Sequence, residues 1–158
     1  MSPEEWLLLS MFTGEYTHTM DGKGRVSVPA ELRDVLRAHY DERLVVTKSL
    51  EGTCLWAFPF KEWQRLADRI AEKGVGGRDL IRLRRRFFAP ARSCSLDRAG
   101  RILLPEPLRE HGQLEKDVTF AAMGGYIEIW QPELWMSEVD ALDESEDALL
   151  DAMAELGL

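Results

Sequence analysis

Apolar and polar residues alternate along several short stretches of the chain, and a period of two predicts β-strands. The alternation is clear in EYTHTM (15–20) and in RSCSL (92–96). Each stretch is followed, further along the chain, by two β-rich runs: RLVVTKSL (43–50) and TCLWAF (53–58) in the first half, and VTFAAM (118–123) and YIEIW (126–130) in the second. Turns at Glu51-Gly52 and Gly124-Gly125 separate the runs of each pair, which predicts two β-hairpins.

Helical spacing replaces the alternation in the middle of the chain. KEWQRLADRIAEK (61–73) places Trp63, Leu66, Ala67, Ile70 and Ala71 on one helical face. After the break GVGG (74–77), RDLIRLRRRFF (78–88) does the same with Leu80, Leu83 and Phe87, and Pro90 ends that helix. From Ser137 onward an amphipathic helix is expected, with the apolar stripe Val139, Leu142, Leu149, Met153 and Leu156.

One phrase occurs twice, as DGKGRVSVPAELR (21–33) and DRAGRILLPEPLR (97–109). Six of the thirteen positions are identical, and the offset is constant at 76 residues. The repeat extends to the strands around the phrase. The predicted fold is therefore α+β and mainly β, with two fused repeats related by a pseudo-twofold axis, because one such unit has too little core to fold alone. The expected divisions are repeat 1 (15–62), inter-repeat helices (63–90), repeat 2 (91–135) and an acidic helix or tail (136–158).

The repeated phrase has the chemistry of a tight turn. Aspartate at position i and glycine at i+3 are typical of a type I turn that ends in a left-handed glycine. The predicted turn-forming residues are Asp21, Gly24, Asp97 and Gly100. Pro29 and Pro105 are expected in the first turn of the following helices. In the returning strands, Val26 and Val28 would face the core, while Ile102-Leu103-Leu104 is expected to be buried on both faces.

Charge is distributed unevenly along the chain. The formal net charge is −8, but residues 131–158 contain nine acidic residues and no Lys or Arg. The stretch from Arg78 to Arg101 contains eight arginines and two aspartates. A balanced body with a basic stripe and an acidic tail remains compatible with a nucleic-acid partner.

Basic side chains in and beside the two turns are the candidate DNA contacts: Lys23, Arg25, Arg98 and Arg101. Arginine can form a bidentate pair with guanine or bind a phosphate. The alternative is a solvated loop in which an arginine pairs with the turn aspartate. Arg82, Arg84, Arg85 and Arg86 are either the wet face of a helix, phosphate contacts, or partners of a neighbouring subunit's acidic tail.

Other classes of site find little support in the sequence. Two aspartates across a pseudo-twofold axis could share a proton as in aspartic proteases. Asp21 and Asp97 lack the Thr or Ser and then Gly that follow such aspartates, so no enzyme and no catalytic residue is predicted. His18, His39 and His111 show no metal-ligand spacing, and Cys54 and Cys94 are expected to be reduced packing thiols, so neither a metal nor a cofactor is predicted.

The two phrases resemble the loop–strand–helix signature of the AbrB-like, SpoVT-type swapped-hairpin β-barrels, which bind DNA. Two such units in one chain, with MFTGEYTHTMDGKGR (11–25) opening the first, are similar to the MraZ family. The resemblance covers roughly residues 11–135. It implies a transcriptional regulator, a repressor of the division and cell-wall gene cluster, that binds short direct repeats in double-stranded DNA as a homo-oligomeric ring, an octamer or larger.

The expected location is cytoplasmic and nucleoid-associated, with no membrane partner. The start MSPEEWLLLS (1–10) has acids where an export signal needs bases, and no apolar run reaches the ~20 residues that span a bilayer. A second reading also stays open, because barrels of this kind bind proteins too: a scaffold or antitoxin-like interaction module that does not bind DNA.

Overall fold

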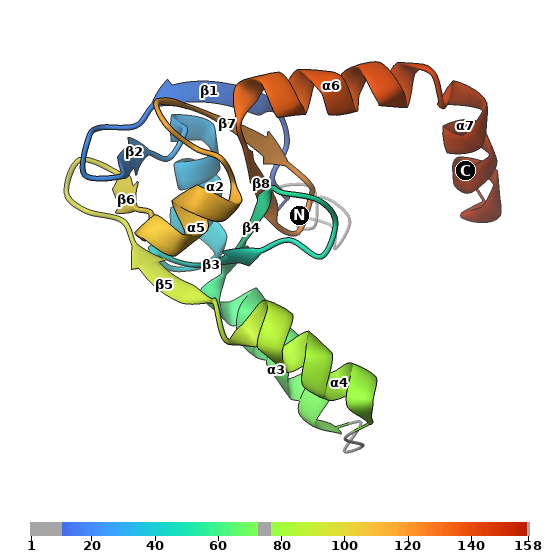
Figure 1. Ribbon diagram of the computed structural model, residues 1–158, viewed down its shortest axis with the longest axis horizontal. Coiled ribbons are helices and arrows are strands. Elements are labelled where there is room, and N and C mark those ends of the chain that lie inside the picture. The colour runs from blue at the N-terminus through green and yellow to red at the C-terminus, as the bar shows by residue number, and fades with distance from the viewer. Residues whose placement is uncertain (1–10, 73–76, 158) are drawn as a thin grey trace.

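The computed structural model describes residues 11–72 and 77–157, and it confirms the α+β class. The N-terminal stretch 1–10 and most of the GVGG break lie outside the described residues. The strands are β1 (Glu15–Thr19), β2 (Arg25–Ser27), β3 (Arg43–Lys48), β4 (Leu55–Pro59), β5 (Arg92–Ser95), β6 (Arg101–Leu103), β7 (Asp117–Ala122) and β8 (Ile127–Trp130). The helices are α2 (Ala30–His39), α3 (Phe60–Glu72), α4 (Arg78–Leu83), the π-helical η1 (Arg84–Phe88), α5 (Glu106–His111), α6 (Pro132–Asp143) and α7 (Glu146–Glu155) (Figure 1).

The strands form a six-stranded sheet, in the order β1-β7-β8-β4-β3-β5, and a two-stranded ribbon of β2 and β6. The order is symmetric with respect to the two repeats: if each strand is replaced by its equivalent in the other repeat, the same order is obtained in reverse. The first strand of each repeat pairs with the third strand of the other, as β1 with β7 and β5 with β3. All the pairings are antiparallel. The expected closed barrel is not found among the described strands, because β1 and β5 lie at opposite edges of the sheet.

The main core lies on one face of the six-stranded sheet and draws on both repeats. Its apolar side chains come from the sheet, from α2 and α5, and from the ribbon, and include Leu32, Leu36, Val46, Ile102, Leu108 and Phe120. A smaller cluster on the other face contains Cys54, Ala121 and Trp130, with Leu134 and Trp135 from the first turn of α6 packed against it. Both predicted packing thiols, Cys54 and Cys94, are buried and free.

The expectation that Ile102-Leu103-Leu104 is buried on both faces is wrong at its central residue. Ile102 and Leu104 are buried, but Leu103 is 53% exposed. The reason is that β6 pairs only with β2, and the ribbon packs on the core with one face. Val26 and Ile102, which pair across the ribbon, point inward, so their neighbours along each strand point outward.

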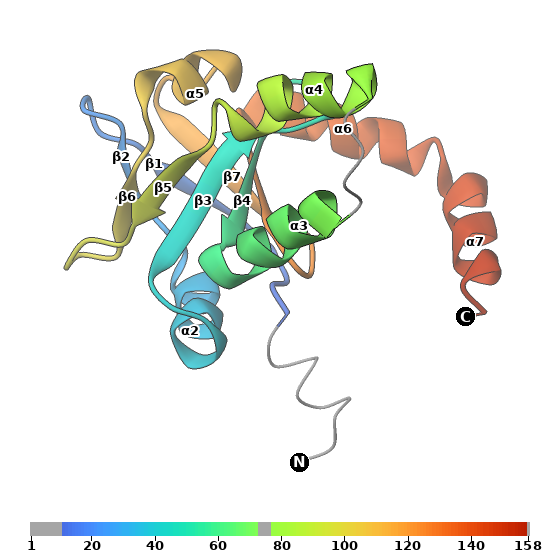
Figure 2. The same ribbon diagram turned by 90° about the horizontal axis from the view of Figure 1, so that it is seen from below.

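The helical predictions need smaller corrections. Pro29 and Pro105 lie just before α2 and α5 rather than in their first turns, with extended backbone at ψ 139° and 147°. The helix predicted over 78–88 forms, but its second half is the π-helical η1. Figure 1 shows α3 and α4 projecting from the body, and in the view of Figure 2 the two helices lie apart from each other.

The acidic tail forms two helices rather than one. The side chain of Gln131 caps α6 by accepting a hydrogen bond from the Leu134 N–H at 2.8 Å, and the chain breaks again at Glu144-Ser145. Every described residue of α7 is exposed, and both views show this helix standing away from the body. Three of its apolar residues, Leu149, Leu150 and Met153, are between 47% and 60% exposed.

This arrangement predicts very unequal losses of stability for neighbouring residues of β6. Ile102→Ala should lower the free energy of unfolding by about 2–5 kcal/mol, because it opens a cavity in the core shared by the repeats. Leu103→Ala should change it by less than about 0.5 kcal/mol, because that side chain is largely in water. Urea denaturation followed by circular dichroism measures both. Equal losses for the two variants would contradict the one-sided burial of the ribbon.

Candidate nucleic-acid interface

The carboxylate of Asp21 holds the turn between β1 and β2. One oxygen of its carboxylate, Oδ1, accepts hydrogen bonds from the backbone N–H groups of Lys23 and Arg25, both at 2.9 Å. The other, Oδ2, accepts one from Arg25 Nε at 2.7 Å. Gly24 adopts φ +93°, a left-handed conformation that glycine takes without steric cost. The aspartate therefore orders both the turn and the guanidinium that follows it.

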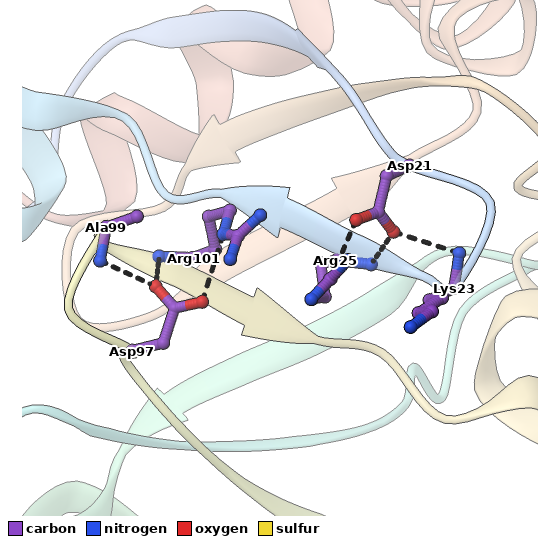
Figure 3. A network of polar contacts seen from close by, with 6 residues as sticks. All are labelled: Asp21, Lys23, Arg25, Asp97, Ala99 and Arg101. Atoms are coloured by element: carbon purple, nitrogen blue, oxygen red, sulfur yellow. Dashed lines mark hydrogen bonds and ion pairs between the residues drawn. The ribbon is translucent and has the colours of Figure 1, made fainter.

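The turn between β5 and β6 repeats this geometry. Asp97 Oδ1 accepts from the backbone N–H groups of Ala99 and Arg101 at 2.9 Å, and its Oδ2 accepts from Arg101 Nε at 3.0 Å. Gly100 has φ +77°. Figure 3 shows the two networks at opposite ends of the antiparallel ribbon, each aspartate bound to its own arginine. This arrangement does not resemble a catalytic pair of aspartates that share one proton.

The hydrogen bonds lower the pKa values of both turn carboxylates. The pKa of Asp21 falls from 3.8 to about 2, chiefly because its carboxylate accepts the Arg25 backbone N–H and then the Arg25 side chain. The pKa of Asp97 is lowered for the same reasons, with Arg101 as the partner. Both aspartates are therefore ionised at neutral pH.

The outer face of the ribbon gathers the two arginines from distant parts of the sequence. Arg25 lies opposite Leu103 and Ser27 lies opposite Arg101, so these four side chains share one face. Arg25 and Arg101 are separated by about 7 Å along the ribbon and about 5 Å across it. Each arginine donates a hydrogen bond from Nε to the carboxylate of its turn aspartate. In the described part of the chain no partner is seen for their terminal amino groups, which leaves these groups for an external acceptor.

Lys23 and Arg98 lie at the tips of the two turns, and both are exposed. Their side chains form no hydrogen bond or ion pair with the residues that the structure describes. They flank the ribbon from opposite ends, so four predicted cations, Lys23, Arg25, Arg98 and Arg101, belong to one surface.

Two further arginines pack against the turns of this ribbon, and the sequence analysis did not select them. A methyl group added at Gly24 would lie 2.8 Å from Arg109 Nε, and one added at Gly100 would meet the side chain of Arg33. Each arginine thus packs on the turn of the other repeat. Arg109 Nε also donates to the Leu104 carbonyl at 2.9 Å. The sequence does contain a signal for these two residues, because Arg33 and Arg109 are the last identical pair of the repeated phrase.

The arginine run of α4 and η1 lies elsewhere. Arg82, Arg84, Arg85 and Arg86 are exposed on the projecting helical pair, and both views place that pair away from the ribbon. Arg82 approaches Asp79 at 3.6 Å. The run is therefore a second basic surface and not an extension of the first.

Other kinds of site are poorly represented. Within residues 11–72 and 77–157, no group of three His, Cys, Asp or Glu side chains could hold a metal ion. Burial raises the pKa of the Cys94 thiol to about 11 and that of the Cys54 thiol to about 12, which suits packing residues rather than nucleophiles. None of the described helices is long and apolar enough to cross a bilayer.

A family model described as "MraZ protein, putative antitoxin-like" matches residues 11–76 and 87–155, one segment for each repeat. The chain belongs to the MraZ family. A protein named "Transcriptional regulator MraZ" from Lachnoclostridium phytofermentans is 42% identical over 149 residues, which is 94% of this chain and 99% of that relative. Proteins of the same name from Carboxydothermus hydrogenoformans and Heliobacterium modesticaldum are 39% and 44% identical, over 92% and 79% of this chain and 98% and 84% of those relatives.

The two Asp–Arg networks predict an acid-sensitive stability. A carboxylate whose pKa is lowered in the folded state stabilises that state above its unfolded pKa, and the contribution is lost as pH falls through the folded value. For Asp21 the loss should run from about pH 4 to about pH 2. Denaturant unfolding at several pH values should show a smaller loss for Asp21→Asn/Asp97→Asn than for the wild type. Parallel pH profiles for the two proteins would remove the networks as the cause.

Proposed function

We propose that this protein is a transcriptional regulator that binds double-stranded DNA with the outer face of the β2–β6 ribbon. The observation that carries the proposal is the gathering of Arg25 and Arg101, oriented by Asp21 and Asp97, on one exposed face. A two-stranded ribbon fits the major groove of B-DNA. The names of the family's relatives support a role in transcription.

The pairing with aspartate is compatible with binding. An exposed arginine on a flexible stem loses rotamer freedom when it binds, and an arginine already held by a carboxylate loses less. The separation of Arg25 and Arg101 corresponds to roughly two to three base-pair steps of about 3.4 Å. In this mechanism the two arginines contact bases or neighbouring phosphates, and Lys23 and Arg98 add phosphate contacts at the ends of the ribbon.

One pair of equivalent residues makes the surface directional. Ser27 and Leu103 occupy the same position of the repeated phrase, yet one is a small polar residue and the other an exposed apolar residue. Apolar side chains contact the thymine methyl group, whereas serine forms hydrogen bonds with bases of either kind. The ribbon would therefore read an asymmetric sequence, as expected for a protein whose sites are direct repeats rather than palindromes.

Removing the two ribbon arginines should weaken DNA binding and its dependence on salt. Arg25→Ala/Arg101→Ala should lose about 1–3 kcal/mol for each base contact, or reduce the log–log salt slope by about one for each phosphate contact. Fluorescence anisotropy measures both quantities across a salt series, with DNA taken from upstream of the gene that encodes this chain.

The matched control is Arg37→Ala, which removes an exposed arginine of α2 that also pairs with a carboxylate, that of Glu42, and lies neither on the ribbon nor on α3 or α4. It should leave affinity and salt slope close to those of the wild type. Circular dichroism checks that the ribbon variant keeps its fold, because it also loses two ion pairs. If that folded variant bound DNA as the wild type does, the site would move to Arg82, Arg84, Arg85 and Arg86.

We further propose that several copies form a ring, with α7 of one subunit packed on α3 and α4 of the next. The apolar residues of α7 are exposed, and an apolar groove of about 300 Å³ lies between the sheet and the two helices. Leu66, Ile70, Leu83 and Phe87 line this groove. The arginines of α4 and η1 beside it complement the nine acids of residues 131–158. In a ring all subunits face the same way around the axis, which also suits direct repeats.

Disrupting the apolar face of α7 should dissociate this assembly. Leu149→Ser/Met153→Ser should lower the molar mass measured by light scattering, while Ala148→Ser/Ala152→Ser on the same helix should leave the mass unchanged. Deleting residues 144–158 should act like the first variant and spare α6, whose Leu134 and Trp135 pack on the body. Affinity for DNA with repeated sites should fall by roughly 10²–10⁴-fold as avidity is lost. An unchanged mass would remove α7 from the interface.

The resemblance to MraZ extends this proposal to repression of the division and cell-wall gene cluster and to a nucleoid location. A scaffold or antitoxin-like module is the second candidate, and the description of the family as antitoxin-like favours keeping it. Salt dependence separates the two, because DNA binding through Z phosphates gives a log–log slope of about −0.9Z. Binding to a protein partner through apolar surface would depend only weakly on salt.

A further inference from the structure

A groove beside α6 is lined by aromatic and acidic side chains that take no part in the proposed DNA binding. It has a volume of about 750 Å³, within the range of small-molecule sites, and lies between the β3–β4 turn, the β7–β8 hairpin and α6. Four aromatic side chains line it: Trp56, Tyr126, Trp130 and Trp135. Three carboxylate side chains line it as well, those of Glu51, Glu128 and Glu138.

Glu128 is the unusual member of this set. It lies in the central strand β8, opposite Trp56 of β4, and only 9% of its surface is exposed. Its Oε2 accepts a hydrogen bond from Trp56 Nε1 at 2.7 Å, and its Oε1 accepts one from Trp130 Nε1 at 3.1 Å. The thiol of Cys54 also approaches Oε2 at 3.5 Å. The side chain is thus held in one orientation at the wall of the groove.

These donors supply hydrogen bonds but no positive charge. Among the described residues Glu128 forms no ion pair, and no Lys, Arg or His lines the groove. A buried carboxylate without a counter-charge is costly. Oε2 already accepts from two donors, whereas Oε1 accepts from Trp130 alone and can accept one more hydrogen bond. The negative charge of Glu128 also affects its neighbour Tyr126. The pKa of Tyr126 is raised mainly by burial and, to a smaller extent, by the charge of Glu128.

We propose that this groove binds a small free organic cation, an alkylammonium or alkylguanidinium. Aromatic walls attract such cations through their π electrons, and the attraction grows when the site excludes water. The cationic head would donate to the remaining acceptor position on Oε1 of Glu128, with Glu51 and Glu138 adding negative charge. An alkyl stem would contact Met123 and Leu142, which also line the groove.

The full-length protein should be titrated by calorimetry with n-butylguanidinium, n-butylammonium and the neutral n-butylurea. Both cations should saturate one site per chain, and n-butylurea should bind about tenfold more weakly or worse, because it lacks the charge. Glu128→Gln, which keeps the shape of the side chain, should weaken cation binding by about tenfold or more. Binding of n-butylurea as strong as that of the cations would overturn the proposal, as would no binding of any probe.

Two matched variants guard against loss of fold in Glu128→Gln. Glu138→Gln removes a rim charge from α6 and should weaken cation binding by about two- to threefold. Asp140→Asn on the same helix lies outside the groove lining and should leave the binding unchanged. Equal binding by the wild type and Glu138→Gln, together with unchanged binding by a folded Glu128→Gln, would remove the carboxylates from the site.

Light scattering at saturating n-butylguanidinium tests the source of the cation. An unchanged molar mass supports a free small molecule as the occupant. A fall in mass would overturn that assignment, because the probe would then be displacing a Lys or Arg side chain of a second copy. DNA binding by Glu128→Gln separates this site from the proposed function, since the ribbon residues are intact in that variant.

Discussion

The pairing of β2 with β6 is the contact on which the rest of the structure depends. Each strand is only three residues long and comes from a different repeat. Val26 and Ile102 pair within the ribbon and are buried in the core. Backbone hydrogen bonds also link each turn to the other repeat, from Val28 N–H to the Gly100 carbonyl and from Leu104 N–H to the Gly24 carbonyl. Neither half can complete its turn, its strand or its core alone.

The same contact explains why the basic face is well ordered on so short a ribbon. The turn aspartates act locally, through hydrogen bonds that close each turn and hold the next arginine. Arg33 and Arg109 act across the repeats, because each packs on the opposite turn. Local bonding sets the orientation of a guanidinium, and exchange between the repeats sets where the two guanidinium groups lie relative to each other.

Features with local causes could be predicted from the sequence. Strand alternation, the hairpin glycines and the Asp–Gly turns depend on neighbouring residues, and the structure has them where the patterns placed them. The prediction that Leu103 is buried was wrong, because a run of three apolar residues does not reveal that one face of their strand is exposed to solvent. Arg33, Arg109 and the Glu128 groove were missed for a related reason: each depends on residues that are distant in sequence. The roles of Lys23, Arg25, Arg98 and Arg101 in binding stay predictions.

Joining the two repeats in one chain has a consequence for how such a surface can change. In a dimer of identical units, any substitution enters both halves at once, so a twofold surface stays twofold. In this chain a mutation enters one copy only, and Ser27 opposite Leu103 shows the outcome: matching positions with different chemistry. Two repeats in one chain therefore need not keep the ribbon symmetric, and the two halves are free to specialise separately while they still complete each other's fold.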